Sequence, residues 1–307
     1  MLAVVATLCG ALATAPSWAT LVNERLAPHE LELHTFAESG RGLRTRRDRA
    51  AGEVLLSVDD SAVVTAGRLL KSESLLTAIA QHAAQGGGPK LTHEQTLCLF
   101  LLSRRLEGSA GDWVEYVSAL PTSQPGPLGF RDEAALLPRC YERVVDVAVQ
   151  HARTQCQRCT AAVRSARDDA DVGPGLLATL SELADVLSSE EAYLWAYATV
   201  RARSIEVGTS VDGADSPLLE TPEGGSVRAL FPVLDMLNHQ PTALTTLYKR
   251  SSGVWEIVSR DTYAAGEQVY VTYGARDNLK LLMTYGFALR DVSVQAGART
   301  MAVQRVN

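Results

Sequence analysis

Two distant segments of the chain repeat one short pattern. Residues 47–58 read "RDRAAGEVLLSV" and residues 260–273 read "RDTYAAGEQVYVTY". Each has Arg-Asp, a short spacer, Ala-Ala-Gly-Glu and an apolar run, which is typical of a glycine-containing turn that leads into a strand. Two copies so far apart are too few for a solenoid. The pattern therefore predicts two similar β pieces of one domain, separated by a long insertion.

The stretch between the two copies has helical patterns. "LTHEQTLCLFLLSRRLEG" opens with a capping box formed by Thr92 and Gln95 and ends at Gly108. A second capping box, Ser188 with Glu191, is expected to open the helix "SSEEAYLWAYATVRARS". We predict an α+β fold with these parts: a first piece of the β core at 31–64, a helical insertion at 65–200, a second piece of the core at 201–290 and a tail at 291–307.

After the insertion the sequence predicts three strands and one short helix. The expected strands are "ALFPVLDML", "GVWEIVSR" and "EQVYVTYG", and the helix is "ARDNLKLLMTYG". Asn278 is the expected cap of that helix.

Composition narrows the class of protein. The 307 residues are 46% hydrophobic and 21% charged, which is typical of a globular chain with a sizeable core. The net charge of −6 argues against general nucleic-acid binding, which needs a basic face. The basic run "RGLRTRRDR" at 41–49 fits a solvated strand-and-turn face as well as it fits a partner.

The five cysteines predict no disulfide framework, because their number is odd and small for the length. Cys156 and Cys159 form a lone CxxC in a helical pattern, whereas a structural zinc site needs four ligands, so we expect no metal. Residues 1–20 are uncharged and fit either a signal or targeting segment or an apolar helix, and they are too short for a clear membrane span. Cytoplasmic, nuclear and organellar locations all stay open.

The segment from Phe231 to Pro241, "FPVLDMLNHQP", poses a problem of buried polarity, because an apolar run carries an Asp and ends in Asn-His. With "ESGRGL", "WAYATVRARS", "VTYG" and "NLKLLMTYGF", in this order, it resembles the SET-domain protein methyltransferases. The resemblance covers about residues 31–290. It is strongest to the branch that includes plant Rubisco large-subunit lysine methyltransferase and actin histidine methyltransferase.

This resemblance implies a fold. It implies a SET β core with a pseudoknot, in which the Asn-His strand passes through a loop made by the C-terminal segment, and a helical insertion that divides the core. The branch usually continues into a helical C-terminal domain that holds the protein substrate, and we expect no such domain in the residues after "YGFALR".

The resemblance also implies an activity, the transfer of a methyl group from S-adenosyl-L-methionine (SAM) to a lysine side chain of a protein substrate. Tyr273 is the expected catalytic residue, and its hydroxyl would orient the incoming amine. Ile205 is expected at the substrate channel, where an apolar residue suits the alkyl stem of lysine better than an imidazole. We expect a monomer. The residues expected to bind the cofactor are Ser39, Gly40, Arg41, Arg203, Asp235, Asn238, His239, Tyr285, Gly286 and Phe287.

The chemistry of these residue types suits those roles. Asn238 offers both donors and an acceptor for an amino acid group. The planar guanidinium of Arg203 suits a carboxylate, although the charge of Arg201 suits it equally. His239 is expected to act mainly through its main chain.

Three alternatives remain open. The chain is also compatible with an inactive SET-like module that binds a protein, and with histidine rather than lysine as the acceptor. A metal-dependent hydrolase that uses His239 and Asp235 is the weakest, because the six histidines form no HxxxH or HxH pair.

Overall fold

The computed structural model describes residues 18–86, 89–108, 113–123, 139–169, 172–208, 216–289 and 302–306. The segment expected to be a signal or an apolar helix therefore lies almost wholly outside the described residues, as does Cys9. Compact packing divides the described chain into two units. We call them the helical unit, residues 64–230 and 282–286, and the β unit, which holds the rest.

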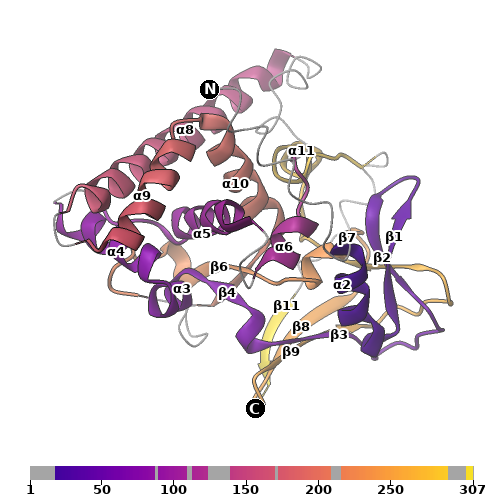
Figure 1. The fold of residues 1–307 in the computed structure, drawn as a ribbon. Helices are drawn as coiled ribbons and strands as arrows, with labels where there is room; N and C mark the ends of the chain where they lie inside the picture. The colour runs from indigo at the N-terminus through magenta and orange to yellow at the C-terminus, as the bar shows by residue number, and fades with distance from the viewer. Residues whose placement is uncertain are drawn as a thin grey trace. The chain divides into compact units, whose positions relative to one another are not determined.

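The helical unit is built around α5, a helix that is buried over most of its length. In α5 every side chain from Gln95 to Ser103 is buried, because this helix is apolar on all its faces. α5 packs against α10, and α8 packs against α4 and α9 (Figure 1). The helices are α3 (Ala66–Ser72), α4 (Ser74–Gln85), α5 (His93–Glu107), α6 (Val114–Ala119), α8 (Arg139–Arg167), α9 (Pro174–Val186) and α10 (Glu190–Arg203).

A small antiparallel sheet completes the helical unit. Its strand order is β4-β6-β5, where β4 is Val64–Thr65, β5 is Ser204–Gly208 and β6 is Ser226–Leu230. None of the described helices is both long and apolar enough to cross a bilayer.

The β unit holds two four-stranded sheets (Figure 1). The first has the order β1-β2-β10-β7, and β7 joins β10 in parallel. The second has the order β11-β8-β9-β3, and β11 joins β8 in parallel. The elements are α2 (Trp18–Leu26), β1 (Leu31–Phe36), β2 (Gly40–Thr45), β3 (Val54–Asp59), β7 (Asn238–His239), β8 (Thr245–Arg250), β9 (Val254–Ser259), β10 (Gln268–Val271) and β11 (Ala302–Val306), with the short 3-10 helices η1 (Ala27–His29), η2 (Asp60–Ala62) and η5 (Leu234–Met236). α11 (Asn278–Tyr285) begins in this unit and ends in the helical unit.

The repeated Ala-Ala-Gly-Glu pattern forms the same turn twice. Gly52 and Gly266 occupy the left-handed region at φ +91° and +87°, which favours glycine. Glu53 accepts a hydrogen bond from the Ala50 amide (2.7 Å), and Glu267 accepts one from the Ala264 amide (2.8 Å). β3 follows the first turn and β10 follows the second, so the predicted turn-and-strand units are confirmed.

The two copies also bond to each other. Arg49 and Tyr263 exchange both backbone hydrogen bonds, at 2.7 and 3.1 Å. On either side of this pair, Gly52 donates to Ser259 (2.7 Å), and Gly266 donates in the equivalent way to Thr45 (2.7 Å). The bonds therefore have a local twofold pattern, and segments far apart in the sequence close one β unit.

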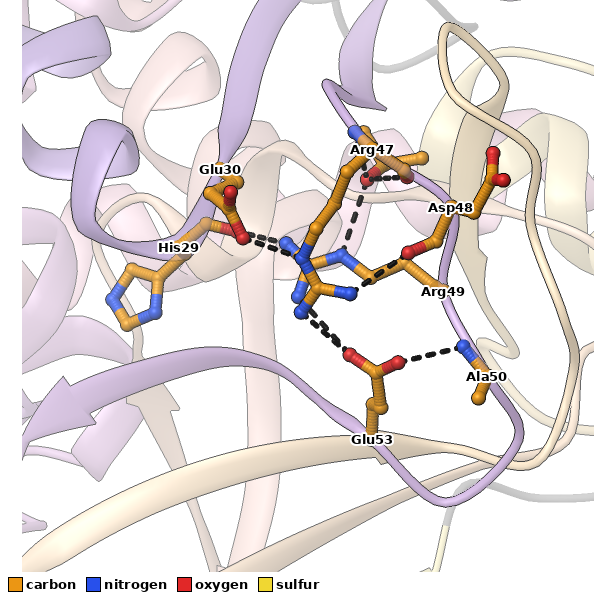
Figure 2. Close-up of polar contacts among 8 residues, drawn as sticks. His29, Glu30, Arg47, Asp48, Arg49, Ala50 and Glu53 are labelled. Atoms are coloured by element: carbon orange, nitrogen blue, oxygen red, sulfur yellow. Dashed lines mark hydrogen bonds and ion pairs between the residues drawn. The ribbon is translucent and has the colours of Figure 1, made fainter.

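Carboxylates pair with the arginines in the basic run at 41–49. Figure 2 shows Arg47 between Glu30 and Glu53, with a distance of 2.6 Å to Glu53. Glu32 forms ion pairs with both Arg44 and Arg46, at a distance of 2.9 Å to Arg46.

Arg49 lies inside the same corner. It is buried and donates to the carbonyl of His29 and to the Thr45 hydroxyl (3.1 Å). Burial lowers the pKa of its guanidinium. The basic run therefore joins the first β piece together, in agreement with a strand-and-turn face.

A largely buried ion pair joins β8, an inner strand of the second sheet, to η2. The Lys249 ammonium lies 3.0 Å from the Asp60 carboxylate, and its side chain is 9% exposed. The Trp255 indole N–H donates to the same carboxylate at 2.6 Å. The same carboxylate thus pairs with the buried ammonium and accepts a hydrogen bond from the indole.

Of the two expected capping boxes, one forms and the other does not. The Thr92–Gln95 capping box is confirmed, with both of its hydrogen bonds present. The capping box of Ser188 with Glu191 is wrong: α10 begins after Ser189 without a side-chain cap. The Ser188 hydroxyl instead donates to the Asp185 carbonyl (2.5 Å) at the end of α9, because only a short turn separates the two helices.

The segment "ALFPVLDML" is not one strand. β6 ends at Leu230 and a turn leads into η5, so the predicted strand is wrong beyond that residue. Pro232 has no amide hydrogen for a ladder, and Val233 adopts φ +74°. A positive φ is rare for a β-branched residue, so its surroundings hold this conformation against strain.

Candidate functional site

The turn between β1 and β2 carries the first group of predicted residues. Ala37, Glu38 and Ser39 connect the paired residues Phe36 and Gly40. Gly40 has φ +66°, which explains the first glycine of "ESGRGL". Ser39 and Gly40 are exposed and Arg41 is half-buried.

Gly42 is required for another reason. A Cβ atom at this position would lie 2.6 Å from Nδ2 of Asn238 and 2.7 Å from Nε2 of Gln268, closer than real Cβ contacts. The missing side chain thus lets two amide groups approach the backbone of β2. Such a close approach is what a glycine permits.

Asn238 joins two of the predicted cofactor residues. It pairs with Tyr270 through the parallel β7–β10 bonds. Its Nδ2 donates to the carbonyl of Arg41 (3.1 Å) and more weakly to that of Ser39 (3.4 Å). Among the residues that the structure describes, its Oδ1 makes no hydrogen bond, which leaves an acceptor available.

Three aromatic rings gather beside Asn238. The ring centroids of His239 and Tyr273 lie 5.1 Å apart with an interplanar angle of 22°, and those of His239 and Phe287 lie 6.1 Å apart. The Tyr273 amide donates to Nδ1 of His239 (3.0 Å). Burial lowers the pKa of His239 to about 4, so the ring is neutral near pH 7. The imidazole is an acceptor here and not a cation.

The Tyr273 hydroxyl points back to the Asn-His strand. It donates to the carbonyl of Leu237 at 2.8 Å, directly before Asn238. The predicted catalytic hydroxyl therefore lies next to a predicted cofactor residue, with no packed core between them.

Asp235 lies in η5 and is half-buried. Its amide donates to the carbonyl of Phe231 at 3.0 Å, across the strained turn at Val233. This turn therefore fixes the position of the Asp235 backbone. It is the only acidic side chain in "FPVLDMLNHQP".

Asn278 has a different role from the expected cap. The carboxylate of Asp277 accepts from the Lys280 amide (2.7 Å) at the start of α11, so Asp277 caps the helix and the prediction for Asn278 is wrong. The Asn278 side chain bonds both the carbonyl (2.9 Å) and the amide (2.8 Å) of Leu289. It thus ties the segment that follows Phe287 to the start of α11.

The remaining predicted residues belong to the helical unit. Arg203 is the last residue of α10, and Ile205 in β5 pairs with Ala229. Tyr285 is the last residue of α11. Gly286 follows it with φ +78°, and its amide donates to the carbonyl of Leu282 (3.0 Å).

Arg201 in α10 makes its contacts within the helical unit. Arg201 lies 3.5 Å from the Glu94 carboxylate and 3.2 Å from the Tyr197 hydroxyl, and its guanidinium stacks on that ring. Arg201 is therefore engaged within its own unit.

Two groups beside the predicted residues were not predicted from the sequence. They are the backbone carbonyl of Leu237 and the side-chain amide of Gln268. Gln268 and Tyr270 share one face of β10, and this alternation was the only available signal. Backbone groups carry no residue-type signal at all.

The cysteines belong to the core of the helical unit. Cys98, Cys156 and Cys159 are free and buried. Burial raises the pKa of the Cys159 thiol to about 12. Among the described residues no cluster of three or more His, Cys, Asp or Glu is placed to hold a metal ion.

Known proteins resemble this chain in sequence and in fold, although no protein-family profile matches it. SET domain-containing protein 4 of Mus musculus is 27% identical over 258 residues, which is 82% of this chain and 53% of that protein. Actin-histidine N-methyltransferase of Danio rerio is 27% identical over 269 residues, covering 85% of this chain and 39% of that protein. The chain spans about half the length of the first of these relatives, and less of the second.

Solved structures share the fold. The SET domain of LSMT bound to lysine and AdoHcy superposes with a TM-score of 0.66 at 16% identity, over 90% of this chain and 58% of that one. Rubisco LSMT bound to AdoMet gives a TM-score of 0.62 at 19% identity, over 90% of this chain and 57% of that one. The predicted α+β SET fold is confirmed. The chain thus has the fold of a SET domain and is similar in sequence to SET domain-containing protein 4 and to the actin-histidine N-methyltransferases.

Proposed function

We propose that this chain is a SAM-dependent protein methyltransferase that methylates a lysine side chain. The juxtaposition of Tyr273 with the Asn-His strand carries the proposal, since its hydroxyl reaches the residue next to Asn238 (2.8 Å). The similar proteins support it, because they include an actin-histidine N-methyltransferase and LSMT bound to AdoMet and AdoHcy.

The residues present fit such a cofactor. SAM, when bound, supplies an electrophilic methyl group on a sulfonium. Asn238 offers an amino group its Oδ1, which makes no hydrogen bond within the described part of the chain, and Gly42 leaves the backbone of β2 open to close approach. Ser39 precedes that strand, and Gly40 and Arg41 begin it. Phe287 and His239 supply an apolar and uncharged wall.

Methyl transfer to an amine needs alignment and the exclusion of water more than acid-base groups. In our proposal the Tyr273 hydroxyl and the Leu237 carbonyl orient the acceptor nitrogen. Neutral His239 acts by holding Tyr273, since its Nδ1 accepts from the Tyr273 amide. A ring with a pKa of about 4 is a poor base near neutral pH. Asp235 is proposed at the charged end of the cofactor.

For Arg203, Tyr285 and Gly286 the assignment to the cofactor depends on the family resemblance alone, as does that of Ile205 to the acceptor channel. The division of the core at residues 64 and 201 also stays a prediction.

The acceptor has a second candidate. Lysine is favoured by the apolar Ile205 and by the lysine and monomethyllysine ligands named for LSMT. Histidine is favoured by the actin-histidine N-methyltransferases among the relatives in sequence. An inactive module that binds a protein is the alternative outside enzymology.

Labelled SAM separates these possibilities. The chain is incubated with methyl-labelled SAM and a cell extract, and the labelled residue is identified after hydrolysis. We expect methyllysine in a protein other than the enzyme. Methylhistidine would move the acceptor to the second candidate, and no label above a Tyr273→Phe control would support the inactive module.

A further inference from the structure

Gln268, the first residue of β10, is buried, with 9% of its surface exposed. Its Oε1 accepts two hydrogen bonds, from the hydroxyl of Ser39 (2.9 Å) and from that of Tyr270 (2.8 Å). Ser39 is far away in the sequence and ends the exposed turn before β2. The side chain therefore links the second β piece to that turn.

The other end of the same amide faces β2. Its Nε2 is buried and has no hydrogen-bond acceptor among the residues that the structure describes. It lies beside the Cα atom of Gly42, next to Nδ2 of Asn238. Burying an unused donor costs free energy, and a methionine of similar length would fill this space without that cost. A role in packing alone does not explain a glutamine here.

We propose that Gln268 is a positioning residue that holds the Ser39–Gly42 turn in the conformation that binds SAM; this inference rests on the proposed function. Asn238 holds the same turn through the carbonyls of Ser39 and Arg41. Asn238 holds the turn from β7, and Gln268 holds it from β10, the strand that leads to Tyr273. The tip of a hairpin is exposed and frays easily, so its geometry depends on such side-chain bonds.

Tyr270 sets the orientation of the glutamine. It lies on the same face of β10, and its hydroxyl shares Oε1 with Ser39. Two hydroxyl donors on one oxygen favour the orientation in which Nε2 faces Gly42.

Hydrogen exchange and SAM affinity test this proposal together. The variants are Gln268→Met, which keeps the length and removes the polar groups, and Ser39→Ala, an exposed change with little risk to folding. We expect faster exchange of the backbone amides at 37–42 in both variants without cofactor. We also expect SAM to bind about tenfold more weakly, with a larger effect on KM for SAM than on kcat. The loss of affinity from Gln268→Met should shrink in the Ser39→Ala background, because the two residues act through one bond.

Gln95→Met is the matched control, since it replaces another buried glutamine, in the capping box of α5. It should lower stability and leave turn exchange and SAM affinity unchanged. Unchanged exchange and affinity in Gln268→Met would overturn this inference and leave the proposed function intact. A wild-type chain that binds no SAM would instead overturn the proposed function and, with it, a role of the turn in binding SAM.

Discussion

Tyr273 is fixed to His239 in two ways: its amide donates to Nδ1 of the histidine at 3.0 Å, and the two rings stack at 5.1 Å. The hydroxyl at the far end of Tyr273 then bonds the Leu237 carbonyl. The neutral His239 thus holds Tyr273 against β7, the strand to which His239 belongs. Tyr273 lies two residues beyond β10, so its bonds to His239 in β7 and to Leu237 fix the position of this hydroxyl.

Replacing Tyr273 with Phe should separate binding from turnover. The variant keeps the ring and its stacking, so we expect SAM affinity within about threefold of the wild type. Turnover should fall by about a hundredfold or more, because the group that orients the acceptor is lost. The lost hydrogen bond should reduce the free energy of unfolding by about 1 kcal/mol. Labelled methyl transfer at saturating SAM provides the measurement, and equal rates in both proteins would show that Tyr273 is not catalytic.

The low pKa of His239 makes stability depend on pH. The folded value is about 4 and the ordinary value is 6.5, so between these values the unfolded chain binds the extra proton. This contribution is complete above pH 6.5 and is lost as the pH falls towards 4. Urea unfolding at pH 7 and pH 5 should show a smaller difference in His239→Asn, whose amide oxygen can replace Nδ1. Burial lowers the pKa of His29 as well, so the test compares pH slopes between variant and wild type.

As a control for the pH experiment, His151→Asn changes a histidine exposed on α8. It should keep the wild-type difference between pH 7 and pH 5. If His239→Asn also keeps it, the neutral, buried state of His239 is wrong.

A methyl group at Gly42 should damage the turn. Gly42→Ala would place its Cβ 2.6 Å from Nδ2 of Asn238, so Asn238 or Gln268 must move. We expect a loss of about 1–3 kcal/mol in the free energy of unfolding, measured in urea, and weaker SAM binding. Gly175→Ala is the matched control because a Cβ there meets nothing within 4 Å. Wild-type SAM affinity in Gly42→Ala would show that this face of β2 lies outside the cofactor site.

The ion pair of Asp60 with Lys249 should matter for stability and not for methyl transfer. Asp60→Ala leaves a buried ammonium and the Trp255 indole without their shared acceptor, so we expect a loss of about 3–5 kcal/mol. Adding Lys249→Met should recover part of it, since the isolated charge is then gone. A chemical denaturation curve for each variant decides this. If Asp60→Ala unfolds like the wild type, the pair is not buried in solution.

The buried thiols should be inert in the folded chain. Burial raises the pKa of Cys98, Cys156 and Cys159, which keeps them protonated and unreactive. In a Cys9→Ser/Cys140→Ser background, a thiol reagent should react with three groups only after denaturant is added. Fast reaction without denaturant would contradict the packing of the helical unit.

Local signals in the sequence predicted local structure well. The capping box at Thr92 and both Ala-Ala-Gly-Glu turns depend on residues within four positions of one another, and all three formed as expected. Ser188 failed as a cap because an equally local partner, the carbonyl of Asp185, was available. Asn278 failed because its partner, Leu289, lies beyond the helix.

The site depends on partners that no local pattern reveals. Ser39 and Gln268 meet only because β2 and β10 are neighbours in one sheet. The Leu237 carbonyl is a backbone group, and its role depends on where Tyr273 arrives. Val233 adopts a strained φ that a valine does not predict. Family resemblance supplied the residues of the site, and the fold supplied the contacts between them.

A calorimetric titration of the chain with SAM tests the central claim most directly. We predict a saturable heat with one site per chain, and much weaker binding in Asn238→Ala, which loses both the acceptor Oδ1 and the bonds to Ser39 and Arg41. No heat with the wild type at millimolar SAM, or equal binding by Asn238→Ala, would contradict the account.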